Sequence, residues 1–200
     1  MKKIKFKFNK FAQINLEHLD DRTLLLNVYL TQLIIFIIGL MIIILQRIPW
    51  KELFQVHQVW MMIGWGIGFA LSVLFIDVML ARWTPKEVMN DGGLNERLFS
   101  RLPLWHIAVI AMVISFSEEL LFRGAIQHSW GPYWTSILFT AIHVRYLKHW
   151  LLTGLVFCIS YGLGWIYEHT GSLWTPVVAH FMIDFILGCV VRYSKEEKQS

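Results

Sequence analysis

The second half of the chain carries acidic, basic and imidazole side chains inside otherwise apolar stretches. Six of them stand out: Glu118, Glu119, Arg123, His143, His180 and Asp184. Carboxylates and imidazoles exchange protons readily, so a set of this kind can activate a water molecule for hydrolysis. The same groups bind Zn²⁺, and chains of them also serve as proton paths in membranes. The residue types therefore point to hydrolysis, with or without a metal, or to proton movement.

Helical spacing separates the two adjacent glutamates. Glu119 and Arg123 are four residues apart with the acid first, which places them on one helix face in the favourable order for an ion pair. Glu118 points about 100° away from that face. It is left without this partner and is free to hold a water or a metal ion. His180 and Asp184 also lie one turn apart, so the carboxylate either orients the imidazole or faces a shared water with it.

The elements that carry these residues are predicted to be membrane-spanning helices. Apolar residues make up 56% of the chain and charged residues only 16%, whereas a soluble domain normally has about 25% charged residues. The apolar residues form long blocks, and roughly 20 helical residues span the ~30 Å hydrocarbon core. We predict an all-α polytopic integral membrane protein with about six transmembrane helices, at residues 24–45, 59–81, 102–122, 133–147, 150–167 and 173–191.

Three parts of the chain follow from this segmentation. Residues 1–101 hold a basic N-terminal tail, two transmembrane helices and a cytoplasmic loop, residues 102–191 hold a core of four helices that carries the six side chains above, and residues 192–200 form a charged tail. The first apolar block is interrupted only by Asn27, Thr31 and Gln32 and is followed by no small-residue cleavage site. We therefore expect it to remain in the mature protein.

Lysine and arginine residues define the expected orientation. The net charge is +4, but the basic residues gather at the ends of the apolar blocks rather than in a nucleic-acid-binding patch. With six spans nearly all of them fall on one side, and by the positive-inside rule both termini face the cytoplasm. We expect a multi-pass protein of the cell membrane. Its partners would be the lipid bilayer and a membrane-associated peptide or protein, with no nucleic acid.

Three motifs occur in order along the core. They are Glu-Glu-x-x-x-Arg at 118–123, Phe-x-x-x-His at 139–143 and His-x-x-x-Asp at 180–184. In this pattern the chain resembles the CAAX-protease and bacteriocin-processing membrane proteins, a group that includes the type II prenyl-protein endopeptidases. Many relatives have Asn at the position of Asp184, so its role as a neutral donor or a carboxylate stays open.

The resemblance implies an intramembrane endopeptidase of the metalloprotease class and a role for each residue. Glu118 and His143 would activate a water for attack on a peptide carbonyl, and His180 with Asp184 would stabilise the oxyanion. The Glu119–Arg123 ion pair would brace the site. Alternatively, Glu118, His143 and His180 would hold Zn²⁺ or another divalent metal with a water in the open position. Both mechanisms, metal-bound and metal-free, stay open.

Two rival functions fit the same residues. One is a membrane immunity or scaffold protein of this fold without catalysis, and the other is a proton-coupled transporter. The resemblance allows prenylated or bacterial peptides as substrates, and the sequence does not choose between them.

Overall fold

The computed structural model describes residues 20–56, 58–85 and 93–196, and every regular element in these ranges is a helix. Most of the predicted basic N-terminal tail (1–19) and the end of the charged C-terminal tail (197–200) lie outside the described residues. The elements are, in order, α1 (Asp21–Leu45), α2 (Trp50–Leu53), α3 (Val59–Trp83), α4 (Leu94–Phe99), α5 (Leu104–Glu119), the π-helix η2 (Leu120–Ile126), α6 (Gln127–Ile142), α7 (Trp150–Thr170) and α8 (Trp174–Glu196).

The described chain contains five helices long and apolar enough to cross a membrane, whereas we predicted about six. The difference lies in the predicted segments 102–122 and 133–147, most of which belongs to one helical stretch of 39 residues, Leu104–Ile142. Only Gly131, with φ 69° and ψ 172°, departs from helical geometry there, and Pro132 follows it. A positive φ suits glycine because it has no Cβ. The chain therefore bends sharply at a single residue, with no connecting loop.

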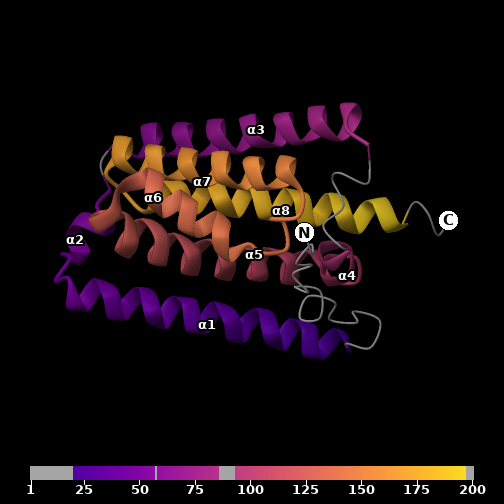
Figure 1. The fold of residues 1–200 in the computed structure, drawn as a ribbon, viewed down its shortest axis with the longest axis horizontal. Coiled ribbons are helices and arrows are strands. Elements are labelled where there is room, and N and C mark those ends of the chain that lie inside the picture. The colour runs from indigo at the N-terminus through magenta and orange to yellow at the C-terminus, as the bar shows by residue number, and fades with distance from the viewer. Residues whose placement is uncertain (1–19, 57, 86–92, 197–200) are drawn as a thin grey trace, which may run out of the picture.

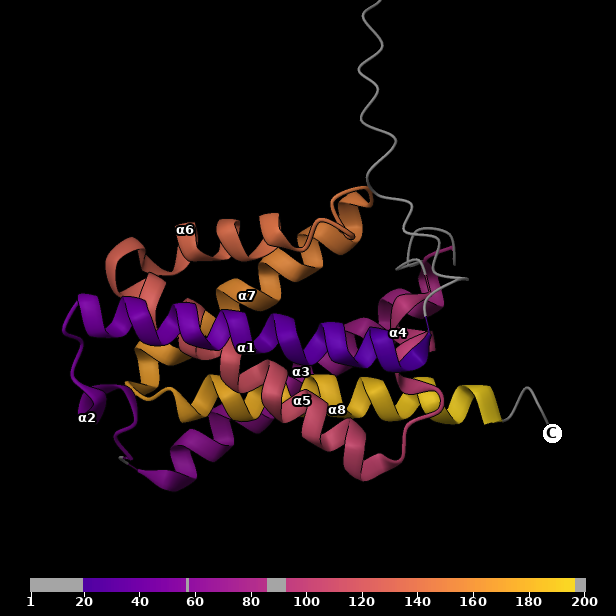
Figure 2. The same ribbon diagram turned by 90° about the horizontal axis from the view of Figure 1, so that it is seen from below.

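Beyond this bend, α6 returns toward the end of the bundle at which α5 begins (Figures 1 and 2). α6 packs against α7, while α8 packs against α3, α5 and α7. The beginning of α1 and the end of α8 lie at the same end of the bundle (Figure 1). This arrangement agrees with the predicted even number of passes. Which end faces the cytoplasm stays a prediction.

Polar and apolar side chains are distributed as expected for a protein in lipid. Large apolar residues such as Leu45, Trp60 and Phe75 are exposed on the outer faces of the helices. Besides apolar core residues, the interior holds charged and amide side chains, among them Glu119 and Arg123, each with no exposed surface. Because charge inside a bilayer is costly, such groups usually face the bundle interior and mark a functional site.

Helix α1 packs closely against η2 at Gly39. A Cβ atom on Gly39 would lie 3.1 Å from the Cα and 3.2 Å from the backbone nitrogen of Leu121. Two turns further toward the start of α1, Gln32 is also buried, and both residues lie on the face that contacts the core. The glycine therefore allows the backbone of α1 to approach the segment that follows the two glutamates.

We predict that Gly39→Val destabilises the protein by about 1–3 kcal/mol, because its side chain overpacks a contact with backbone atoms. Thermal unfolding in detergent measures the effect. Gly64→Val is the matched control, since a Cβ at Gly64 on α3 meets nothing within 4 Å. Equal unfolding temperatures for the two variants would contradict the close α1–η2 packing.

Candidate active site

Glu119 is the most buried carboxylate of the site, and it contacts two nitrogen-bearing side chains, those of Arg123 and His180. Its Oε1 lies 3.2 Å from Nη1 of Arg123, and its Oε2 lies 3.1 Å from Nε of the same guanidinium. Nδ1 of His180 lies 2.7 Å from Oε1 of Glu119. The ion pair expected from the four-residue spacing is therefore present. The contact with His180, 61 residues away in the chain, was not predicted.

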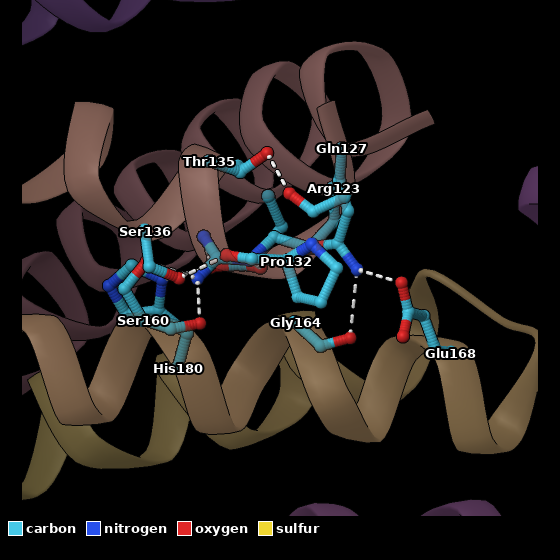
Figure 3. Close-up of polar contacts among 11 residues, drawn as sticks. Arg123, Gln127, Pro132, Thr135, Ser136, Ser160, Gly164, Glu168 and His180 are labelled. Carbon is cyan, nitrogen blue, oxygen red and sulfur yellow. Dashed lines mark hydrogen bonds and ion pairs between the residues drawn. The ribbon is translucent and has the colours of Figure 1, made fainter. Parts of the chain in front are cut away.

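Arg123 extends this cluster to α7. Its Nη2 donates hydrogen bonds to the carbonyl of Ser160 at 2.7 Å and to Oγ of Ser160 at 2.9 Å (Figure 3). The guanidinium also lies over the ring of Phe139 from α6, 5.2 Å from its centroid. Planar guanidinium groups suit such buried positions because their fixed donors can meet several acceptors at once. Arg123 thus joins η2, α6 and α7 at the site.

His180 lies between two carboxylates. While Nδ1 faces Glu119, Nε2 lies 3.5 Å from Oδ2 of Asp184, one turn further along α8. The side chain of His180 is about 10% exposed and that of Asp184 27%. Asp184 therefore lies on the more open side of the ring, within ion-pair distance of it, as the four-residue spacing predicts.

Glu118 is hydrogen-bonded by a residue of another helix, a contact that was not predicted. Its Oε1 accepts a hydrogen bond of 3.1 Å from Nε2 of Gln32 on α1, and both residues are buried. Spacing within one helix cannot reveal a partner 86 residues away. The available signal was the presence of Gln32 inside an apolar block. A lone amide there needs a hydrogen-bond partner.

His143 lies just past the end of α6, because the helix ends at Ile142 rather than at the predicted residue 147. Its Nδ1 lies 2.7 Å from the carbonyl of Phe139, and its ring stacks on those of Phe139 and Tyr146. A carbonyl only accepts, so Nδ1 donates the proton and Nε2 is left as the free ring nitrogen. The ring is half-buried.

The predicted metal ligands Glu118, His143 and His180 are not brought together as a ligand set. Across residues 20–56, 58–85 and 93–196, no group of three or more His, Cys, Asp or Glu side chains is arranged to hold a metal ion. A catalytic zinc site normally has three protein ligands. The donor arrangement does not fit such a site, so no reaction step is derived through a metal. The metal-bound and the metal-free mechanisms both stay predictions.

A row of polar contacts continues from the site along α7, and it was not predicted. Gln127 lies four residues after Arg123, and its Nε2 donates to the carbonyl of Gly164 at 2.9 Å and to Oε1 of Glu168 at 3.3 Å (Figure 3). A Cβ on Gly164 would lie 2.7 Å from Oε1 of Gln127. Glycine at this position therefore lets the amide of Gln127 approach the backbone of α7.

Comparisons with known proteins cover the same region. A family model described as type II CAAX prenyl endopeptidase Rce1-like matches residues 100–186, a segment that includes the six predicted site residues. A similar protein in Bacillus subtilis (strain 168), "Uncharacterized protein YpbD", is 40% identical over 131 residues, which cover 66% of this chain and 69% of that protein. No solved structure matches the chain.

We predict that Arg123→Met destabilises the protein by about 3–5 kcal/mol, because it leaves the Glu119 carboxylate buried without its main counter-charge. Thermal unfolding in detergent checks this, with Lys148→Met as the control for removing an exposed basic residue. The double variant Glu119→Gln/Arg123→Met is expected to recover part of the loss. If the Arg123→Met protein were as stable as the Lys148→Met protein, the ion pair would not stabilise the core.

Proposed function

The chain belongs to the Rce1-like family of type II CAAX prenyl endopeptidases, and on this premise we propose that it is an intramembrane endopeptidase. Its substrate is a membrane-associated or lipid-anchored peptide or protein, from which it hydrolyses a peptide bond. The observation that carries the proposal is the buried Glu118 beside the Glu119–His180–Asp184 cluster, inside helices that are apolar on the outside.

The two glutamates have different surroundings, which supports different roles. Glu119 is engaged by Arg123 and His180 and cannot take up a proton without breaking these contacts. Within the part of the chain that the structure describes, Glu118 is held through Oε1, by Gln32. Its Oε2 is therefore the atom that accepts a proton from the attacking water, as a general base in a water-poor site.

The proposed reaction uses this base together with His180. As Oε2 of Glu118 takes one proton from water, the water oxygen attacks the peptide carbonyl carbon and forms a tetrahedral oxyanion. His180, placed between two carboxylates, carries a proton on each ring nitrogen, and its Nε2–H turns from Asp184 to the oxyanion. The C–N bond then breaks, and Glu118 returns the proton to the leaving amine.

His143 acts from the rim of the site in this proposal. Its Nδ1 is held by the Phe139 carbonyl, so Nε2 is the nitrogen available to the water or to the leaving amine. In the structure the residue is tied to its own helix. We propose that it meets Glu118 only when substrate is bound, since hydrogen bonds between catalytic groups often tighten only in the substrate complex.

The substrate and the location are proposed from the same features. The outer faces of the helices are apolar and the reactive groups are buried, so a peptide must reach them from the lipid or from its surface. A lipid anchor or an apolar segment would hold the peptide there. We place the protein in the cell membrane, with both termini in the cytoplasm.

Replacing Glu118 by Gln is expected to lower the cleavage rate at least about 100-fold, because the amide keeps the shape but cannot take a proton. The assay follows new peptide termini by mass spectrometry, using synthetic prenylated and unprenylated membrane-anchored peptides in phosphatidylcholine vesicles. Glu52→Gln on α2 is the control, an exposed carboxylate outside the site. Wild-type cleavage rates in both variants would reject Glu118 as the base, whereas no cleavage by the wild-type protein would favour the scaffold function.

Removal of divalent metals is expected to leave the cleavage rate unchanged, because the described residues form no metal-binding group of three donors. The measurement compares protein dialysed against EDTA with untreated protein, with the bound zinc quantified in both. A rate that falls on dialysis and returns with stoichiometric Zn²⁺ would establish the metal-bound alternative instead.

A further inference from the structure

Gln32 belongs to a part of the chain that the family model does not include. The model matches residues 100–186, and Gln32 lies on α1, yet its amide contacts Glu118 directly. Gln32 is only 6% exposed and Glu118 only 7% exposed. A charged oxygen accepting from an amide in such a site makes a stronger hydrogen bond than a neutral pair.

The packing of α1 fixes where Gln32 stands. Gly39, two turns further along α1, lies against the backbone of Leu121, three residues after Glu118. Ile43, with no exposed surface, packs in the same core cluster as Leu120. Two contacts on one helix face thus set both the distance and the rotation of α1 relative to Glu118. The amide is presented by a rigid element, as precise positioning requires.

One atom of Gln32 has no partner within the described chain. Its Nε2 donates to Glu118, but its Oε1 is buried and accepts no hydrogen bond. An amide oxygen buried without a partner costs free energy, and an apolar side chain of similar size would avoid that cost. A residue kept only for packing would not need the amide. This unpartnered oxygen belongs to the same amide group whose nitrogen donates to Glu118.

We propose that Gln32 is a positioning residue of the active site, supplied by α1, and this rests on the proposed function. By donating to Oε1 of Glu118, it holds the carboxylate in one rotamer, with Oε2 directed to the water. Its own Oε1 is the acceptor left for the second hydrogen of that water. The active site then depends on α1 as well as on residues 100–186, the segment that the family model matches.

The test compares the full-length protein with Gln32→Leu and Asn27→Leu in the vesicle assay. Asn27 is the control because it is an amide on the same helix but exposed. We expect Gln32→Leu to lower kcat about 10- to 100-fold with KM changed less than about twofold, since misplacement of the base affects the chemical step. Asn27→Leu is expected to match the wild type. Gln32→Met keeps the length of the side chain and removes the amide. The unfolding temperature of each variant tests whether a loss of kcat comes from misfolding.

A second background separates positioning from a structural role. Glu118→Asp has a shorter carboxylate that the amide of Gln32 no longer reaches. In that background Gln32→Leu is expected to cost less than about twofold, because residues that act as a unit are not additive. An equal loss in both backgrounds, or full kcat in Gln32→Leu, would overturn the role of Gln32 and leave the protease in place. No cleavage by the wild type would overturn the proposed function and this role with it.

Discussion

Glu119 has no exposed surface, so its negative charge must be balanced by groups within the bundle. Arg123 from η2 and His180 from α8 provide that balance, and Arg123 in turn is held by Ser160 on α7. Four elements are therefore fixed relative to one another by one carboxylate. Lipid offers no water to replace a lost partner, so each of these contacts constrains the others. The candidate site depends on this cluster.

The same cluster explains how two adjacent glutamates can differ. Glu119 makes the contacts that hold the helices together, while Glu118, the preceding residue, accepts one hydrogen bond within the described chain, from Gln32 on α1. The π-helix that follows α5 widens the turn between Glu119 and Gln127, and such bulges are frequent at functional sites. Arg123 and Gln127 both reach α7 from this stretch (Figure 3). The proposed base and the groups that support it thus lie on one continuous helical stretch, Leu104–Ile142.

The sequence was informative wherever one helix carried the signal. Apolar block length predicted the membrane-spanning helices, and four-residue spacing predicted the contacts of Glu119 with Arg123 and of His180 with Asp184. Contacts between helices were missed, above all Gln32 with Glu118, because helical periodicity contains no information on which faces meet. The bend at Gly131 was missed as well. A single residue with positive φ reverses the chain there, where the prediction required two separate segments.

The central claim is that water, activated at Glu118, hydrolyses a peptide bond within this bundle. The most direct measurement is a single-turnover reaction of the purified protein with a membrane-anchored peptide in ¹⁸O-labelled water, followed by mass spectrometry. The account predicts a new carboxyl terminus that carries a single ¹⁸O atom taken from the solvent. No new carboxyl terminus, or one that carries no label, would contradict it.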